Sequence, residues 1–160
     1  MALTKLREFL DSQKIEYVVI SHSLAYTAQG IAALAHIPGK ELAKTVIVRM
    51  DGQLAMAVVP ASALVNLPAL RTVGGAKTAE LASESDFKDR FPDCETGAMP
   101  PFGNLYNMKV FVDEILTRDK EIAFNAGSHR ELVRMPFADF LRMVKPTVAA
   151  FAAGRPAAAA

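Results

Sequence analysis

Residues 42–59, LAKTVIVRMDGQLAMAVV, carry the clearest structural signal in the chain. Two apolar runs rich in β-forming residues, 42–50 and 54–59, flank the dipeptide Asp51-Gly52. Asp-Gly between such runs is a strong hairpin signal, because the two-residue turn needs positive φ at both central positions. The stretch therefore predicts two paired antiparallel strands.

Outward from this hairpin, the pattern of apolar residues predicts a mixture of helices and strands. Leucines and phenylalanines at helical spacing predict a helix over residues 3–13, and IEYVVI at 15–20 predicts a strand. By the same criteria we expect helices over 27–35, 61–67, 78–83, 84–91 and 137–144, and strands over 109–113 and 121–125. This order predicts a mixed α+β domain with an antiparallel component, not a regular βαβ series.

The composition suits one domain and sets limits on function. With 160 residues, 51% of them hydrophobic, the chain can bury a core. Lys and Arg number 18 against 17 Asp and Glu, which argues against a long nucleic-acid footprint but not against gripping one end of a nucleic acid. We expect one domain over residues 1–151 and a disordered Ala-rich tail over 152–160.

The terminal segments and the cysteine content favour a cytoplasmic protein. The N-terminus is charged and amphipathic, unlike a signal peptide, and no segment approaches the roughly 18 to 20 apolar residues of a membrane span. Cys94 stands alone, which excludes an internal disulfide and disfavours a cysteine-type zinc site. The three histidines lack metal-ligand spacing, and Gly74-Gly75 is not a phosphate-binding P-loop, so we expect no metal and no cofactor.

Residues 97–103, GAMPPFG, predict a rigid loop that presents its backbone. Gly97 permits positive φ and close approach of a ligand. Pro100 and Pro101 fix φ and carry no N–H, so they stiffen the turn. Such a loop could hold a small polar group by its outline, and the alternative is an ordinary tight turn.

Two further residues have chemistry that could serve a site. Lys44 opens an apolar strand, where it could face a phosphate or carboxylate or else extend to water. His129 follows a predicted strand in NAGSH (125–129), where it could move a proton or cap local backbone. His22 could line a cleft. Cys94 with His129 would be a nucleophile–base pair, and a small-molecule hydrolase built on it is one alternative function.

Three of these features, in this order, resemble one known family. They are AKTV (43–46) opening a strand, Gly97-x-x-x-Pro101-Phe102-Gly103, and AGSH (126–129) followed by a closing amphipathic helix. The set resembles the YbaK/ProX family of free-standing aminoacyl-tRNA deacylases, related to the editing domain of bacterial prolyl-tRNA synthetases, over residues 3–146. The resemblance implies a mixed α/β fold around a curved, largely antiparallel sheet or partial barrel with flanking helices.

The resemblance also implies roles for individual residues. Lys44 contacts the substrate end of the tRNA, Gly97 and Pro101 hold the aminoacyl group through the backbone, and His129 lines the pocket with a catalytic role open to it. These four form the expected catalytic set. The resemblance implies a substrate-binding set of His22, Thr45, Ala98, Met99, Pro100, Phe102, Gly127 and Ser128.

The function implied is a trans-editing hydrolase that cleaves the ester of a small amino acid such as Ala from tRNA-Pro. Its partner is the 3′ CCA end of an aminoacyl-tRNA, with prolyl-tRNA synthetase as a further partner. In the family a hydroxyl of the terminal ribose helps to activate water, which suits a chain without an obvious general base. Met99 is expected to narrow the pocket. A non-catalytic module that binds tRNA ends or a small ligand is the second alternative.

Overall fold

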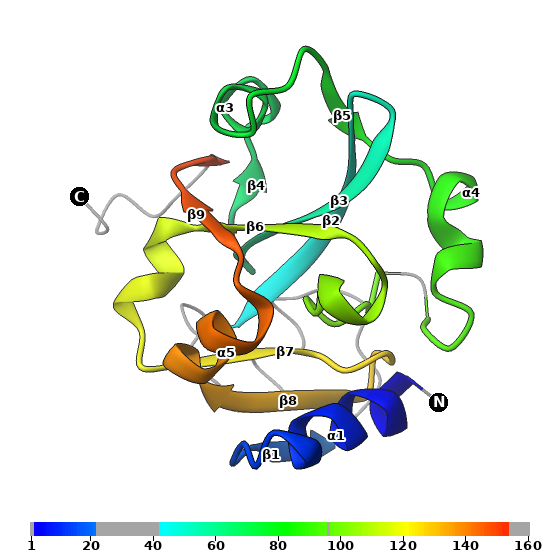
Figure 1. Cartoon of the computed structure of the whole chain (residues 1–160), viewed down its shortest axis with the longest axis vertical. Coiled ribbons are helices and arrows are strands. Elements are labelled where there is room, and N and C mark those ends of the chain that lie inside the picture. The colour runs from blue at the N-terminus through cyan, green and yellow to red at the C-terminus, as the bar shows by residue number, and fades with distance from the viewer. Residues whose placement is uncertain (1, 22–41, 96, 154–160) are drawn as a thin grey trace.

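The computed structural model describes residues 2–21, 42–95 and 97–153 (Figure 1). Its helices are α1 (Ala2–Ser12), α3 (Leu67–Val73), α4 (Glu84–Phe87) and α5 (Phe137–Val144), with short 3-10 helices η1 (Lys88–Arg90), η2 (Gly103–Leu105) and η3 (Glu114–Arg118). Its strands are β1 (Val18–Ser21), β2 (Ala43–Met50), β3 (Gln53–Pro60), β4 (Leu64–Val65), β5 (Ala79–Leu81), β6 (Lys109–Asp113), β7 (Glu121–Asn125), β8 (Glu131–Pro136), β9 (Thr147–Ala149) and β10 (Ala152–Ala153).

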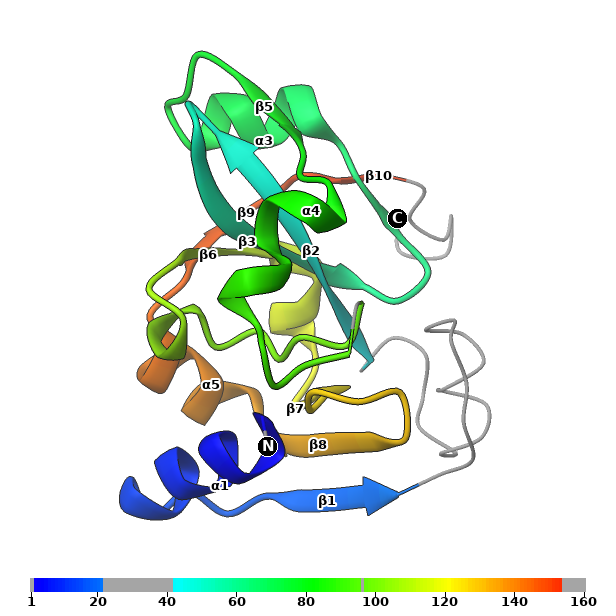
Figure 2. The same cartoon turned by 90° about the vertical axis from the view of Figure 1, so that its right-hand side faces the viewer.

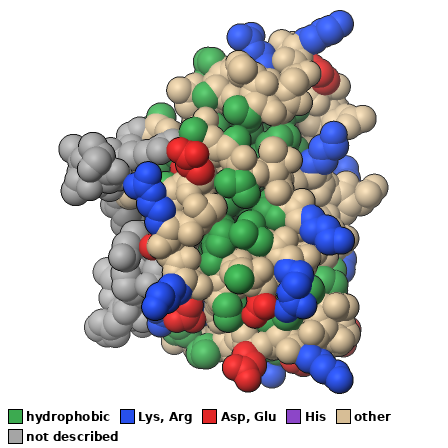
Figure 3. All heavy atoms as spheres, turned by 60° about the vertical axis from the view of Figure 1, so that its left-hand side comes forward, with side chains coloured by type: hydrophobic (Ala, Val, Ile, Leu, Met, Phe, Trp, Pro, Cys, Tyr) green, Lys and Arg blue, Asp and Glu red, His purple; other side chains and the backbone are tan. Residues whose placement is uncertain are grey.

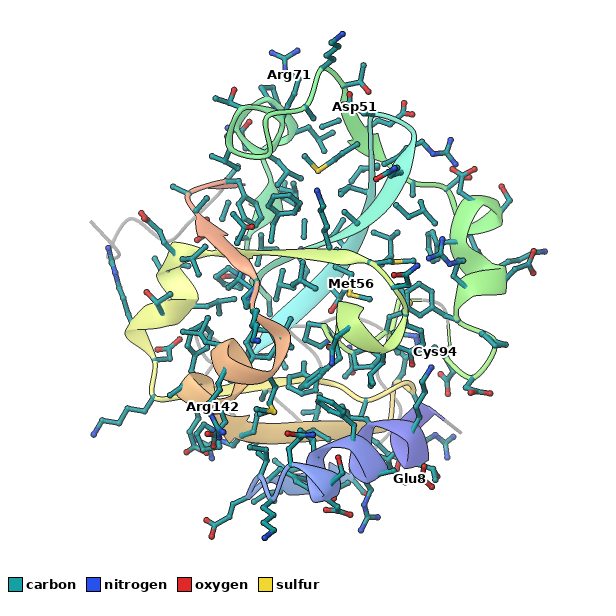
Figure 4. The ribbon with its side chains drawn as sticks, in the orientation of Figure 1. Glu8, Asp51, Met56, Arg71, Cys94 and Arg142 are labelled. Atoms are coloured by element: carbon teal, nitrogen blue, oxygen red, sulfur yellow. The ribbon has the colours of Figure 1, made fainter. Side chains whose placement is uncertain are left out.

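The predicted hairpin is confirmed and forms the centre of a five-stranded sheet. β2 and β3 pair antiparallel in the order β5-β2-β3-β6-β9, and β6 and β9 join parallel to their neighbours. Asp51 and Gly52 have φ of 50° and 82°, as a type I′ turn requires. The Asp51 carboxylate also accepts the N–H groups of Lys77 and Thr78, both at 2.9 Å, at the top of Figure 4. This carboxylate therefore ties the hairpin tip to the segment leading into β5.

A second, antiparallel sheet lies below the first in Figure 2 and has the order β1-β8-β7. A parallel bridge between Leu42 and Ala123 joins the beginning of β2 to β7. The short strands β4 and β10 form a separate antiparallel pair. The sheets are largely antiparallel and open, with helices on their flanks, so the predicted α+β class is confirmed.

The core has two parts, one on each side of the five-stranded sheet. The larger part packs α1 and α5 against the sheets and contains an aromatic group in which Phe102 lies 5.5 Å from Phe124 and 5.6 Å from Phe140, between ring centroids. The smaller part lies under α3 and contains Leu70, Phe111 and Phe151. The loop at 97–103 is thus anchored in the larger core through Phe102.

Several predicted elements agree with the structure, and three differ for local reasons. The helices at 3–13, 84–91 and 137–144 and the strands at 109–113 and 121–125 are confirmed. The helix at 84–91 is α4 followed by η1. The expected helix over 61–67 is wrong: β4 lies there, and α3 begins only after Asn66, whose side chain accepts the Ala69 N–H at 3.1 Å. The expected helix over 78–83 is β5, which pairs with β2.

The strand expected over 15–20 begins later, as β1, because the end of α1 uses the preceding residues. The Ile15 N–H donates to the Leu10 carbonyl at 3.0 Å, and Lys14 has a φ of 57°. The sequence also gave no prediction for β8, β9 or β10. The helix expected over 27–35 lies outside the described residues.

β10 lies at the beginning of the segment 152–160 that was expected to be a disordered tail. Asp113, fully buried at the end of β6, accepts the N–H groups of Phe151 at 2.9 Å and Ala152 at 2.8 Å. These bonds hold β10 against β4, so Ala152 and Ala153 are part of the fold. Residues 154–160 lie outside the described residues.

The surface carries both apolar and charged areas. On the face shown in Figure 3, hydrophobic side chains run down the middle, with Lys and Arg at the edges. Val148 of β9 and Leu64 of β4 are exposed. None of the helices that the structure describes is long and apolar enough to cross a membrane.

Candidate active site

Two loops that the resemblance singles out are joined by backbone hydrogen bonds. The Glu95 N–H donates to the Gly127 carbonyl, and the Gly127 N–H donates to the Ala98 carbonyl, both at 2.8 Å. Gly127 follows β7, whereas Glu95 and Ala98 lie more than 25 residues earlier in the chain. This reciprocal pair fixes the turn after β7 against the loop at 97–103.

His129 lies against Gly97 in this arrangement. Gly97 has a φ of 84°, a conformation that side chains other than glycine rarely adopt, and a Cβ built there would lie 3.6 Å from the His129 Cε1. The imidazole is buried, and the backbone N–H of His129 donates to the Glu95 carboxylate at 3.3 Å. The structure therefore brings together two of the four residues in the expected catalytic set.

The rest of the loop turns its side chains inward. Met99 and Phe102 are buried in the larger core, and Ala98, Pro100 and Pro101 are buried as well. At Gly103 there is no room for a side chain, because a Cβ would overlap the Met108 carbonyl and Val110. Any substrate contact from Met99 or Phe102 would therefore come from the backbone, and the expected narrowing of a pocket by the Met99 side chain stays a prediction.

The backbone of this loop has hydrogen-bonding capacity to spare. The Ala98 N–H donates to the Glu95 carbonyl at 3.0 Å, and the two prolines have no N–H. Within residues 42–95 and 97–153, the N–H groups of Gly97 and Met99 donate to no acceptor. Gly97 is exposed and Met99 is buried. Free N–H groups in a stiff loop are suited to bind an oxygen that gains negative charge.

Lys44 lies at the beginning of β2, where it pairs with Val59 of β3. Leu42, just before β2, forms a parallel bridge with Ala123 of β7. Lys44 lies two residues beyond the bridge on β2, and Asn125 lies two residues beyond it at the end of β7, the end that leads to His129. Partial burial lowers the pKa of the Lys44 ammonium, and no carboxylate among the described residues pairs with it. A half-buried cation of this kind is available to an anionic ligand.

Thr45 and Ser128 were both expected to bind substrate. Thr45 lies on the face of β2 opposite to Lys44, because successive side chains alternate along a strand. The Ser128 hydroxyl donates to the Glu131 carboxylate and accepts the Arg130 N–H, each at 3.2 Å. Ser128 therefore stabilises the turn that carries His129, and His22 lies outside the described residues.

Sequence reasoning missed two residues of this site. Asn125, the last residue of β7, is 9% exposed, and its side-chain oxygen has no hydrogen-bond partner among the described residues. Glu95 joins the two loops through its backbone and carboxylate. Asn125 belongs to the NAGSH motif, but the motif alone does not show that its side chain is buried. The role of Glu95 depends on contacts with residues distant in sequence.

Cys94 is unsuited to act as a nucleophile. Burial raises the pKa of its thiol, and its Sγ lies 3.7 Å from the Tyr106 hydroxyl (Figure 4). The ammonium of Lys5 lies 4.5 Å from the centre of the Tyr106 ring. The thiol is therefore protonated at neutral pH, which counts against the hydrolase built on Cys94. Within the part of the chain that the structure describes, no group of His, Cys, Asp and Glu side chains could hold a metal ion.

The fold has close counterparts among solved structures. The hypothetical protein APE2540 matches with a TM-score of 0.83 at 21% identity, over 92% of this chain and 99% of that one. A crystal structure described as a candidate trans-editing enzyme for prolyl-tRNA synthetase matches with a TM-score of 0.80 at 17% identity, over 94% and 96% of the two chains. At these identities the likeness defines the fold, which is that of the YbaK-like α+β domains.

The family model of the aminoacyl-tRNA editing domain matches residues 22–143 of this chain. The chain therefore belongs to the family of aminoacyl-tRNA editing domains. A curated relative, the multifunctional Ser/Thr-tRNA deacylase ProXp-y of Escherichia coli (strain K12), is 28% identical over 152 residues, covering 92% of this chain and 90% of the relative. The resemblance read from the three motifs is thus confirmed. The protein is an aminoacyl-tRNA deacylase, a hydrolase of the YbaK/ProX type.

Proposed function

We propose that this protein removes a small amino acid, such as Ala, from mischarged tRNA-Pro, acting in trans as a free-standing enzyme. The observation that carries the proposal is the stiff loop at 97–103, in which Gly97 lies beside the buried His129 and the N–H groups of Gly97 and Met99 donate to no acceptor among the described residues. The membership of the editing family supports the reaction, and the backbone character of the site supports a small aminoacyl group.

The chemistry required of the site is modest, because an aminoacyl ester is already activated. Water attacks the ester carbonyl carbon, and the bond from that carbon to the ribose oxygen breaks. The products are the free amino acid and the tRNA with its hydroxyl restored. The N–H groups of Gly97 and Met99 would stabilise the oxyanion that forms on the carbonyl oxygen.

The remaining polar groups would hold the two ends of the ester. We assign Lys44 to a phosphate of the terminal nucleotides, because its ammonium lacks a carboxylate partner among the described residues. We assign the Asn125 side-chain oxygen to the α-ammonium group of the amino acid, a donor that this buried acceptor can satisfy. His129 would close the pocket over Gly97.

Selection of the amino acid would depend on the space available beside the loop. One methylene changes binding by only about 1–3 kcal/mol, so a synthetase cannot reject all smaller amino acids at its own site, and a second site is physically reasonable. The curated relative is named as a Ser/Thr-tRNA deacylase, which makes Ser and Thr the second candidates for the amino acid removed.

The test is a deacylation assay with purified protein and a panel of mischarged tRNAs, Ala-tRNA(Pro) first, followed by seryl- and threonyl-tRNAs. We expect Ala-tRNA(Pro) to lose its amino acid well above the rate in buffer. Faster loss from seryl- or threonyl-tRNA would favour the second candidates. Binding of tRNA without loss of any amino acid would favour a non-catalytic module and contradict the proposal.

Substitutions then test the residues. Lys44→Ala should lower kcat/KM for Ala-tRNA(Pro), and Lys120→Ala is the matched control, since Lys120 is exposed in the turn before β7. A Lys44→Ala variant with full activity would remove the role given to Lys44. Cys94→Ser should leave the rate unchanged, and loss of activity in that variant would restore the thiol hydrolase.

A further inference from the structure

A second candidate binding region lies at the other end of β2, around the tip of the β2–β3 hairpin. It is an open groove of about 880 Å³ between the hairpin, α4 with η1, η2 and the beginning of β6. In Figure 2, α4 stands in front of the hairpin that forms the back of this region. The polar side chains that line it are Arg49, Asp51, Gln53, Asp86, Arg90, Asn104, Asn107 and Lys109.

The carboxylates of the groove are already engaged within the protein. Asp86 pairs with Arg49 at 2.9 Å and accepts the Ser83 N–H at 2.9 Å. Asp51 accepts two backbone N–H groups, and these bonds, with the charge of Lys77, keep its pKa low. Arg49 neutralises Asp86, whereas Asp51 keeps its charge, because its backbone donors are neutral. Three cations, Arg49, Arg90 and Lys109, against these two carboxylates leave the lining with one net positive charge.

Two cations of the groove have no carboxylate partner among the described residues. The Arg90 guanidinium donates to the carbonyls of Tyr106 at 3.1 Å and Asn107 at 3.5 Å, which orient it without neutralising it. Lys109 is exposed at the first residue of β6, and its ammonium has no hydrogen bond or ion pair with another described residue. The groove thus offers two cations without a carboxylate partner among the described residues, flanked by the side-chain amides of Asn104 and Asn107.

The groove lies within a short distance of the candidate active site. Gly103 lines it, and Gly103 ends the loop that begins at Gly97, so the two glycines are at most about 20 Å apart. A polymer whose end occupies the active site can therefore reach the groove.

We propose that this groove binds the sugar–phosphate backbone of the acceptor end of the tRNA. The inference rests on the proposed function, because it takes the aminoacyl end to lie beside Gly97. Spaced cations and amide donors in an open, polar groove suit successive phosphates, which position a nucleic acid without reading its sequence. A contact set this small also agrees with a net charge of +1, since a long footprint would need many more cations.

The experiment compares two charge reversals, Lys109→Glu in the groove and Lys120→Glu outside it. Both residues are exposed, and both substitutions change the net charge equally. The readout is the Kd for uncharged tRNA over a series of salt concentrations, measured by fluorescence titration. It does not require turnover, so it tests the groove even if no mischarged tRNA is hydrolysed.

We expect Lys109→Glu to weaken tRNA binding about threefold to tenfold and to reduce the slope of log K against log salt by about one, with Lys120→Glu within about twofold of the unmodified protein. KM for mischarged tRNA should rise in parallel, whereas hydrolysis of an aminoacyl-adenosine ester, too short to reach the groove, should not change. Equal effects of the two reversals on Kd would overturn the proposal. So would an equal loss of activity on the short ester.

Discussion

Asp113 and Asn125 occupy equivalent places in the two sheets and differ in what their side chains do. Each is the last residue of its strand, β6 or β7, and each is a buried polar residue, 0% and 9% exposed. The Asp113 carboxylate accepts three backbone N–H groups, from Ile115, Phe151 and Ala152. The Asn125 side-chain oxygen accepts none among the described residues.

The difference separates a polar group that builds the fold from one that is held ready for a ligand. A buried acceptor without a donor costs about 1–3 kcal/mol, so proteins keep few of them. Asp113 avoids that cost by fixing the segment that leads into β10. Asn125 bears it at the point where β7 meets the turn carrying Gly127 and His129, the turn that we assign to the active site.

The largest effect should follow from removing the structural carboxylate. We expect Asp113→Ala to lower the free energy of unfolding by about 3–5 kcal/mol, because three N–H groups, one buried and two part-buried, lose their acceptor together. Urea unfolding measures the loss. Hydrogen exchange should show the amides of Phe151 and Ala152 losing their protection before the rest of the sheet.

The graded control is Asp113→Asn, which keeps one acceptor oxygen and should lose less, about 1–3 kcal/mol. At temperatures where the variants remain folded, both should hydrolyse mischarged tRNA at close to the normal rate. A rate that falls in proportion to the lost acceptors, without a loss of stability, would place Asp113 in the site and remove the distinction from Asn125.

The second largest effect should follow from removing the Asn125 side chain, which should lower activity and leave stability nearly unchanged. We expect Asn125→Ala to lower kcat/KM for Ala-tRNA(Pro) about tenfold while changing stability by less than about 1.5 kcal/mol, because the hydrogen bond that is lost forms only with substrate. Single-turnover deacylation and urea unfolding on the same preparation measure the two quantities.

An N-acetylated aminoacyl-tRNA gives this prediction its control. Acetylation removes the α-ammonium group that we assign to Asn125, so the difference between Asn125→Ala and the unmodified protein should shrink on this substrate. A difference that stays tenfold would mean that Asn125 acts elsewhere. A stability loss as large as that of Asp113→Ala would mean that Asn125 is structural too.

The contrast also shows which parts of the fold the sequence could predict. The β2–β3 hairpin was predictable because its turn chemistry and β-rich runs are local, and Asp51 and Gly52 carry that signal themselves. β8, with Glu131, Arg134 and Pro136, lacks a β-rich run and forms because it pairs with strands on both sides. β10 depends on Asp113, almost forty residues away, and no local pattern predicts such a contact.

The candidate site divides in the same way. Gly97 and His129 were predictable as members of motifs, and the structure adds that they lie in contact. Met99 and Phe102 stood in the same motif, but their burial in the core could not be read from a turn sequence. Glu95 was not predicted at all, because its part consists of bonds to Gly127 and His129 that form only in the folded chain.

A smaller effect should separate the strain at Gly97 from its role in the site. Gly97 and Gly52 have φ of 84° and 82°, and a Cβ at either would meet no closer contact than the 3.6 Å to His129. We expect Gly97→Ala and Gly52→Ala each to cost about 1 kcal/mol of stability, because alanine is strained at positive φ. Thermal unfolding measures both.

Only Gly97→Ala should also slow deacylation, since its methyl group would stand between His129 and the backbone that faces the ester. Gly52→Ala, at the hairpin tip, should hydrolyse mischarged tRNA at the normal rate. Equal rates in the two variants would show that the loop backbone at Gly97 does not approach the substrate.

The smallest effect concerns Lys44, which, like the Asn125 side-chain oxygen, has no polar partner among the described residues. Burial lowers the pKa of its ammonium, so at neutral pH the folded state holds a charge that is better solvated in the unfolded state. Lys44→Met should therefore leave stability unchanged or raise it by a few tenths of a kcal/mol, even as activity falls.

The stability gained by Lys44→Met should depend on pH. Below the folded-state pKa of Lys44 both states are protonated and the penalty is complete, so the gain from Lys44→Met is largest there. As pH rises from the folded-state pKa toward the ordinary lysine value, the folded state sheds the proton first, and the gain declines. Urea midpoints of the two proteins at neutral and alkaline pH measure this. A variant less stable than the unmodified protein at neutral pH would mean that Lys44 supports the fold, as Asp113 does, and is not held in reserve for the substrate.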